Sequence, residues 1–441
     1  MSTITQKLMK AKAWLHSVVL HTFATSAVML GLGLVNSVLL ARWLGPAGRG
    51  EIAAAMLWPY WLMIIFSTGL LRSLIYHVAQ PDSQPASAWS TAMWLGAVQS
   101  VVAVAVGYLA LPLLLKRQAP DVLFASRVYL GMIPFYMLGQ YGLHTLQGLQ
   151  RFAAVNRLSL ILPVGYLAGT VGLRLAGRLQ LLDIVVLHFS LHIITLVCSL
   201  ITLRHCFRLH LTPQRALAGR LLKYGFKISA GELTSTVNLR LDQMILASLF
   251  PAVQLGLYTA AVSAAQLAEV LGYAFRMVVT PRVAAQRSAE DRVRMLGTYF
   301  RRYWLVSIPY CGALAAVLPF AIPVLLGKAY AQSVLVAEIL LLGSVLVAAR
   351  QVLAAGAQAL GDAWLNSKAE LVALPVTVVT LLVLLPRLGI LGAAISSVLA
   401  YGTQAAVVLV GLKTRHGIRL RTLIARKEHQ LPIREAAASQ A

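Results

Sequence analysis

Long runs of apolar residues, separated by short polar connections, recur along nearly the whole chain. Each run is about 20 residues or longer, the length that an α-helix needs to cross the hydrocarbon core of a bilayer. The pattern predicts about twelve membrane-spanning helices, near residues 16–40, 52–71, 90–114, 121–147, 157–177, 181–203, 224–249, 255–280, 303–326, 333–357, 367–386 and 389–412. These spans leave no room for a separate soluble domain, so the pattern indicates an all-α polytopic membrane protein.

The longest internal connections are Arg204–Lys223 and Arg282–Arg302, and both are basic. The first lies near the middle of the chain and separates six spans from six. Two related halves around a site near the membrane midplane are a common transporter construction. We therefore expect two six-helix lobes around a central cavity. The expected parts are an N-terminal lobe, a basic inter-lobe loop, a C-terminal lobe and a basic tail, at residues 1–203, 204–223, 224–412 and 413–441.

A weak internal similarity accompanies this division. The segments Ala41–Ala55 and Ala247–Ala261 both end a span, turn at proline and glycine, and continue into a helix of small residues. Two unrelated helical hairpins often share such a pattern, so the similarity by itself leaves a duplication open.

Charge is scarce and unevenly placed. Charged residues make up 12% of the chain and hydrophobic residues 59%, whereas about 25% of a soluble protein is charged. Of the 38 lysines and arginines, 26 fall in the two tails and in alternate connections, and 8 in the remaining connections. This split follows the positive-inside rule. It predicts a bacterial inner-membrane protein with both termini in the cytoplasm, and it explains the net charge of +24 without nucleic-acid binding.

Several classes of function lack their sequence signatures. The chain contains no GxxxxGK[ST] phosphate-binding loop and no HExxH zinc motif. Its external connections are too short to carry the catalytic loop of a membrane-embedded enzyme of glycan assembly. The three cysteines lack metal-ligand spacing, and His188 and His192 have only Asp183 near them, so we expect no metal, no cofactor and no enzymatic activity. The class of function that remains is a helical bundle that moves a substrate across the membrane.

Four segments carry a resemblance to a known family. They are LARWLGPAGRGE at Leu40–Glu51, and the segments Asn238–Ala261, Leu326–Gly343 and Gly389–Ala400. In order and spacing they resemble the polysaccharide-exporting flippases, the Wzx-type branch of the MOP exporter superfamily. The resemblance implies transport of undecaprenyl-pyrophosphate-linked oligosaccharides from the cytoplasmic to the periplasmic leaflet, for O-antigen, capsule or exopolysaccharide assembly. It implies lipid-linked oligosaccharide, membrane lipids, a polysaccharide polymerase and other assembly proteins as partners.

Arginines within or beside the spans are the candidate substrate-binding residues. An ionisable group in a span costs about 2.5–3.5 kcal/mol on insertion, so it usually faces a cavity or a partner. The planar guanidinium binds phosphate oxygens in a bidentate manner, which suits a pyrophosphate. The candidates are Arg42, Arg240, Arg276 and Arg350. The alternative for Arg240 is an ion pair between helices, and for Arg42 it is snorkelling toward the lipid headgroups. Glu338 lies on nearly the same helix face as Arg350 and forms a comparable set with it.

Carboxylates within the spans are the candidates for coupling transport to a proton or sodium gradient, because protonation or cation binding can neutralise them. These candidates are Glu232, Asp242 and Glu269. Glu269 and Arg276 lie two turns apart on one helix face. The alternative is that each carboxylate accepts structural hydrogen bonds.

Two other functions remain open. A multidrug or cation antiporter of the same superfamily would share the architecture but favour acids over arginines in its cavity. A membrane-embedded glycan-assembly enzyme is the alternative from another class, and the short external loops argue against it.

Overall fold

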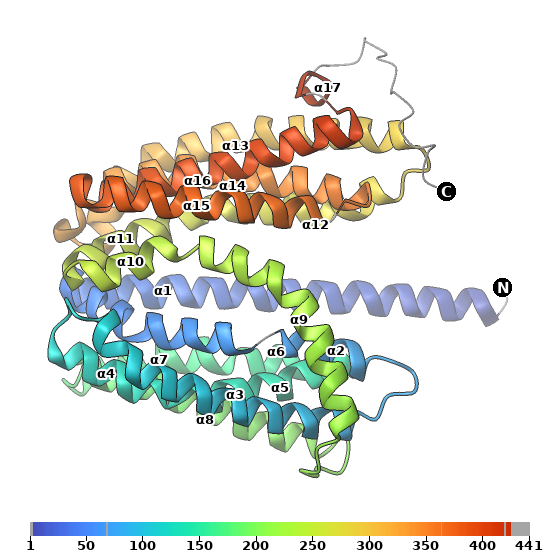
Figure 1. The fold of residues 1–441 in the computed structure, drawn as a ribbon, viewed down its shortest axis with the longest axis horizontal. Helices are drawn as coiled ribbons and strands as arrows, with labels where there is room; N and C mark the ends of the chain where they lie inside the picture. Colours follow the sequence, from blue (N-terminus) through green and yellow to red (C-terminus); the bar gives the residue numbers. More distant parts are fainter. Residues whose placement is uncertain (1–2, 68, 363, 419, 425–441) are drawn as a thin grey trace. The chain divides into compact units, whose positions relative to one another are not determined.

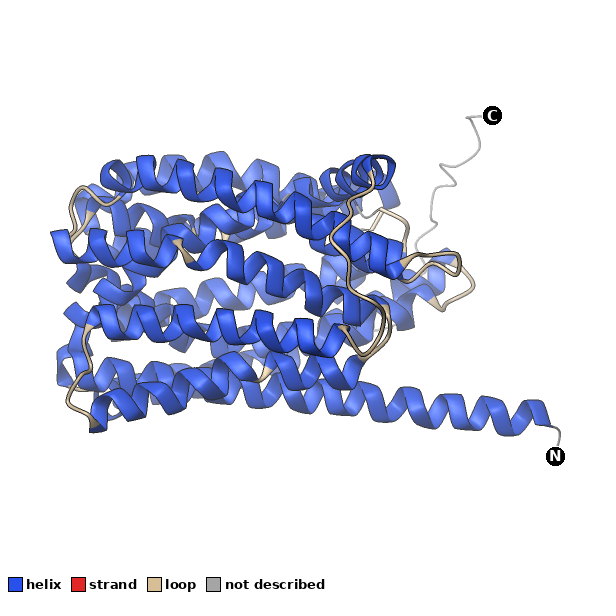
Figure 2. Cartoon of the chain, turned by 90° about the horizontal axis from the view of Figure 1, so that it is seen from below, coloured by secondary structure: helices blue, strands red, loops and turns tan. Residues whose placement is uncertain are grey.

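The computed structural model describes residues 3–67, 69–362, 364–418 and 420–424, without the side chains of residues 3–19, 229–232, 235 and 289. Within these ranges the chain consists of helices and connecting loops, with no strand (Figure 2). It divides into two compact units. Unit 1 comprises Met1–Leu233 and Ala247–Gly256, and unit 2 comprises Thr234–Leu246 and Leu257–Ala441.

Unit 1 is built from the helices of the first half of the chain (Figure 1). They are α1 (Thr3–Ser67), α2 (Leu70–Val78), α3 (Pro85–Leu114), α4 (Pro120–Leu130), α5 (Met132–Gly148), α6 (Phe152–Ser159), α7 (Ile161–Leu175), α8 (Leu181–Leu203) and most of α9 (Arg215–Asn238).

Unit 2 contains the helices of the second half. They are the first part of α10 (Leu241–Leu249), most of α11 (Ala252–Ala265), η1 (Gln266–Ala268), α12 (Glu269–Ala284), α13 (Ala289–Leu326), η2 (Lys328–Tyr330), α14 (Ser333–Ala359), α15 (Trp364–Leu388), α16 (Ile390–His416) and α17 (Leu420–Ile424). The elements η1 and η2 are single 3₁₀ turns.

Ten helical segments of the described chain are long and apolar enough to cross a membrane. Large apolar side chains also point outward from them, and Leu109, Leu305 and Phe320 are 79%, 77% and 74% exposed. Such exposure is unfavourable in water but suits contact with lipid chains. The predicted all-α, multi-pass membrane protein is confirmed, whereas the number of twelve spans is not.

Three of the expected spans account for the difference. The first span and residues 52–67 of the second lie in α1, which is broken at Gly45, where φ is 68° and ψ is −176°. A positive φ suits glycine, and the following Pro46 lacks the amide hydrogen that a continuous helix would need. The seventh expected span coincides with α9 and α10, which are not among the ten.

The expected connection at Arg282–Arg302 is mostly helical, which corrects the sequence-based boundary. Helix α12 continues to Ala284, and α13 begins at Ala289. The hydroxyl of Ser288 accepts a hydrogen bond from the backbone N–H of Asp291 at 3.0 Å and so caps α13. Acidic residues follow in the first turn, where they favour a helix N-terminus. Residues 215–223 of the other expected loop are likewise helical, at the start of α9.

Two glycines of unit 1 bring backbone segments into direct contact. A Cβ atom on Gly50 would lie 1.7 Å from the carbonyl oxygen of Ala252, and one on Gly256 would lie 1.9 Å from that of Pro46. Only hydrogen fits at both positions. Small residues commonly permit such close approach of helices in membranes.

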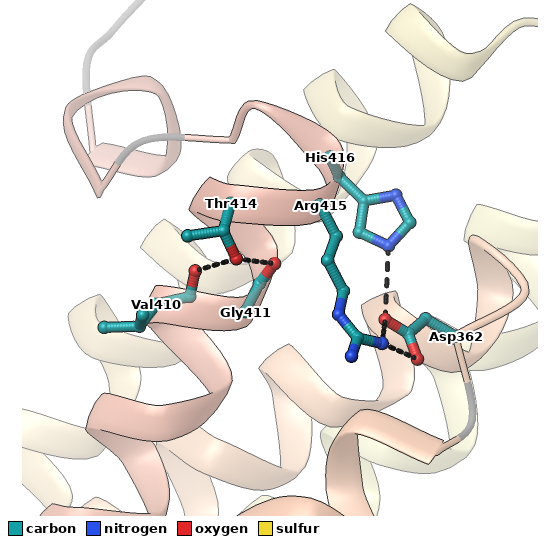
Figure 3. Close-up of polar contacts among 6 residues, drawn as sticks. All are labelled: Asp362, Val410, Gly411, Thr414, Arg415 and His416. Carbon is teal, nitrogen blue, oxygen red and sulfur yellow. Dashed lines mark hydrogen bonds and ion pairs between the residues drawn. The ribbon is translucent and has the colours of Figure 1, made fainter. Parts of the chain in front are cut away.

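An ion pair fixes the end of α16 in unit 2. The guanidinium of Arg415 donates to both carboxylate oxygens of Asp362, at 2.9 and 3.2 Å. The imidazole of His416 points toward the same carboxylate at 3.7 Å (Figure 3). The end of α16 is therefore tied to the connection between α14 and α15.

Candidate functional site

A buried ion pair lies inside unit 2. The guanidinium Nη1 of Arg350, on α14, is 3.1 Å from the carboxylate Oε1 of Glu370, on α15. The same nitrogen donates to the side-chain oxygen of Asn366 at 2.6 Å. Both members of the pair are almost fully buried, with side chains 9% and 2% exposed. The predicted substrate residue Arg350 is thus held by an acid, and the acid is Glu370 rather than Glu338.

The second oxygen of the Glu370 carboxylate is also occupied. It accepts hydrogen bonds from the side-chain amides of Asn238 at 3.0 Å and Gln404 at 2.8 Å. Asn238 additionally donates to the backbone carbonyl of Glu370 at 2.9 Å. Donors from three other helices therefore meet at one carboxylate, which offsets the cost of burying its charge. Sequence reasoning missed Glu370 and both amides.

A second buried carboxylate, Asp242, lies at the start of α10. It accepts hydrogen bonds from the hydroxyl of Tyr258 and from that of Ser397, the latter at 3.0 Å. Its other oxygen accepts the backbone N–H of Gln243 at 2.7 Å. The predicted coupling residue Asp242 is therefore held by three donors, as expected of a structural carboxylate.

A third acid, Glu269, is placed differently. It is half-buried in the first turn of α12, directly after the 3₁₀ turn η1. Its carboxylate interacts electrostatically with Arg240 and Arg350. Within the described part of the chain it forms no hydrogen bond and no ion pair, so proton or cation binding to it would disrupt no other contact.

The two other predicted arginines of unit 2 are Arg240 and Arg276. Arg240 is half-buried in the two-residue break between α9 and α10. Arg276 is exposed on α12, two turns after Glu269, and interacts electrostatically with Arg350. Neither guanidinium forms an ion pair among the described residues. Two of the predicted arginines, Arg240 and Arg350, therefore act electrostatically on Glu269, whereas Arg276 acts on Arg350.

Two predicted site residues belong to unit 1. Arg42 is exposed on α1, three residues before the break at Gly45, and belongs to unit 1. Glu232 lies in α9, but its side chain is outside the described side chains.

The histidine pair in unit 1 has partners of its own. The Nδ1 atom of His188 lies 2.8 Å from the hydroxyl of Tyr129, and its ring meets that of His192 edge-on at 4.9 Å between centroids. No group of three or more potential metal ligands occurs among the described residues. The pair is therefore best interpreted as an interhelical contact.

Comparison with solved structures shows where this fold occurs. The inward closed form of the lipid II flippase MurJ superposes with a TM-score of 0.75 at 14% identity, over 89% of this chain and 87% of that one. An inward-facing multidrug resistance MATE transporter of the MOP superfamily has a TM-score of 0.73 at 14% identity, over 88% and 94%. A eukaryotic MATE transporter has a TM-score of 0.62 at 14% identity, over 91% and 95%.

The family assignment comes from the sequence. Comparison with curated proteins finds no match, whereas the family described as polysaccharide biosynthesis protein matches residues 15–286, more than half of the chain. This match and the fold confirm the resemblance to the polysaccharide branch of the MOP exporters. The chain belongs to the polysaccharide biosynthesis protein family and has the helical fold of the MOP superfamily of transporters and flippases.

Proposed function

We propose that the protein is a flippase that moves an undecaprenyl-pyrophosphate-linked oligosaccharide from the cytoplasmic to the periplasmic leaflet by alternating access. The family match and the transporter fold support translocation rather than enzymatic catalysis. The exported units would supply O-antigen, capsule or exopolysaccharide assembly, with a polymerase among the partner proteins. The inner membrane is the proposed location, with both termini in the cytoplasm.

One observation carries the choice of an anionic substrate. Arg240 and Arg276 are arginines of unit 2 that form no ion pair within the described residues, whereas Arg350 is neutralised by Glu370. Unpaired guanidinium groups in an apolar protein favour an anionic ligand, and their geometry suits phosphate oxygens. A multidrug antiporter would favour acids at these positions, since its substrates are cations.

The coupling acid is proposed to be Glu269. Asp242 already accepts three hydrogen bonds, so its neutralisation would disturb the fold. Glu269 has no such bonds and lies in the field of Arg240 and Arg350. Proton or sodium binding there would strengthen the positive field that acts on the pyrophosphate, and release of the cation would weaken it.

Flipping of a fluorescent undecaprenyl-pyrophosphate oligosaccharide in proteoliposomes tests the proposal. We expect the parent protein to flip it, the Arg276→Ala variant to be inactive though folded, and Arg276→Lys to recover part of the rate. The matched control is Arg294→Ala, which removes an exposed arginine paired with Glu290 at 3.1 Å. Transport of an organic cation instead of the lipid, or unchanged flipping by Arg276→Ala, would overturn the proposal.

A further inference from the structure

A pocket of about 590 Å³ lies within unit 1 and is lined by none of the arginines and acids described above. It is formed by the end of α5, the start of α6 and the end of α8. Its lining includes Arg151, Phe152, Arg157, Leu158, Ile201 and His205. Its volume is in the range of pockets that hold small ligands, about 300–1,000 Å³.

The polar side of the pocket is cationic. Arg151 and Arg157 both line it, together with His205, and no acidic residue does. The Nε of Arg157 donates to the backbone carbonyl of Ala153 at 3.2 Å, which fixes the guanidinium and leaves both Nη groups available. Arg151 makes no side-chain hydrogen bond or ion pair within the described chain. Elsewhere Arg178, Arg294, Arg350 and Arg415 all have an acidic partner.

The other side of the pocket is apolar. Leu146, Phe152, Leu158 and Ile201 contribute to it, and Ile201 is 44% exposed on the outer surface of α8. A ligand that fits both sides carries a phosphate group and an adjacent hydrocarbon chain. This combination is the chemistry of a phospholipid at the boundary of the membrane.

The connections that form the pocket place it at that boundary. The α5–α6 and α8–α9 connections are among those that carry the excess of lysine and arginine, on the same predicted side as the N-terminus. Anionic lipids of the cytoplasmic leaflet attract basic groups at this depth. From the cavity and its two arginines we infer that this pocket binds the phosphate headgroup of one anionic phospholipid.

Native mass spectrometry of the full chain in detergent tests this inference with phosphatidylglycerol and phosphatidylcholine of identical acyl chains. We expect one bound phosphatidylglycerol at an occupancy at least about tenfold above that of phosphatidylcholine, because the two guanidinium groups attract the net negative headgroup of the first and repel the quaternary ammonium group of the second. The Arg151→Gln/Arg157→Gln variant should lower the phosphatidylglycerol signal to the phosphatidylcholine level. The doubly lysine-substituted variant, Arg151→Lys/Arg157→Lys, should retain part of it.

The matched control is Arg204→Gln/Arg208→Gln, which removes the same charge from the same predicted side outside the pocket and should leave lipid binding unchanged. Arg151 and Arg157 are both exposed. An unchanged unfolding temperature would verify that the Arg151→Gln/Arg157→Gln variant is folded. Unchanged phosphatidylglycerol binding by Arg151→Gln/Arg157→Gln would overturn the inference. So would displacement of the lipid by equimolar undecaprenyl pyrophosphate or by millimolar inorganic phosphate, which would assign the pocket to the substrate head or to free phosphate.

Discussion

Arg350 on α14 and Glu370 on α15 form an ion pair of 3.1 Å that is almost fully buried in unit 2. The glutamate is further held by Asn238 and Gln404, so the whole group joins four helices. Removal of one member would leave the other charge buried without its ionic partner. The first role of this arginine is therefore structural, whatever field it adds at Glu269.

We predict that Arg350→Met destabilises the protein by about 3–5 kcal/mol, the range for breaking a buried ion pair. Arg350→Met/Glu370→Gln should be less destabilised than the single variant, because glutamine removes the stranded charge and keeps an acceptor for the neighbouring amides. Thermal unfolding of the detergent-purified proteins measures both effects.

The exposed ion pair between Arg294 and Glu290 provides the comparison for the thermal unfolding of Arg350→Met. Arg294→Met should change stability by no more than about 0.5 kcal/mol, since an exposed i,i+4 pair contributes little. If Arg350→Met unfolds at the parent temperature but fails to transport, the arginine acts on the substrate and not on the fold.

Glu269→Gln should keep substrate binding and lose its response to an imposed proton or sodium gradient. Glu269 and Arg276 are separated by two helical turns, about 10 Å along the axis. At an effective dielectric constant of about 20, their interaction is roughly 1–2 kcal/mol, enough to change phosphate affinity about tenfold. Flipping in proteoliposomes with and without a gradient measures the response.

Glu338→Gln is the matched control for this experiment, because Glu338 is another half-buried acid of unit 2, on α14. It should respond to the gradient as the parent does. A Glu269→Gln variant that also responds normally would reduce Glu269 to a structural role.

Gly50→Ala should destabilise the protein by about 1–3 kcal/mol, the usual cost of overpacking. The new methyl group would lie 1.7 Å from the carbonyl oxygen of Ala252, a backbone atom that cannot rotate away. Gly31→Ala is the control, since nothing lies within 4 Å of its added Cβ. Equal unfolding temperatures for the two variants would show that the backbone contact yields without cost.

The predicted orientation is tested with single cysteines in a background that lacks Cys198, Cys206 and Cys311. In intact spheroplasts an impermeant thiol reagent should label Lys116→Cys and leave Arg208→Cys unmodified until the membrane is permeabilised. The uneven placement of lysine and arginine is the physical reason. The reverse labelling pattern would place both termini outside the cytoplasm.

Much of the fold could be predicted because the lipid environment leaves a strong pattern in the sequence. Apolar length predicts membrane-spanning helices, and proline and glycine predict the turn after the first of them, since hydrophobic thickness and backbone geometry act locally. The partner of Arg350 could not be found in this way. Glu338 lies on the same helix and was visible as a periodic neighbour, whereas Glu370 becomes its partner only when α14 and α15 pack side by side.

The sequence around Glu370 nevertheless carries a signal of its polar partner. Asn366 and Glu370 are four residues apart in the first two turns of α15, so they share one face of that helix. Two polar groups on one face of a membrane helix indicate a polar partner on an adjacent helix. The three hydrogen bonds to Asp242 left no comparable signal, because Tyr258 and Ser397 are distant in sequence and common in spans.

The ten residues Ala247–Gly256 belong to unit 1, although the chain on either side of them belongs to unit 2. Their contact with the turn at Pro46 and Gly50 is made by backbone atoms with no room for a side chain. Consider a chimaeric protein in which two relatives are joined near residue 203. It would combine the turn at Pro46 and Gly50 from one parent with residues 247–256 from the other. Functional chimaeras require that the donor of the first half also supply residues 247–256.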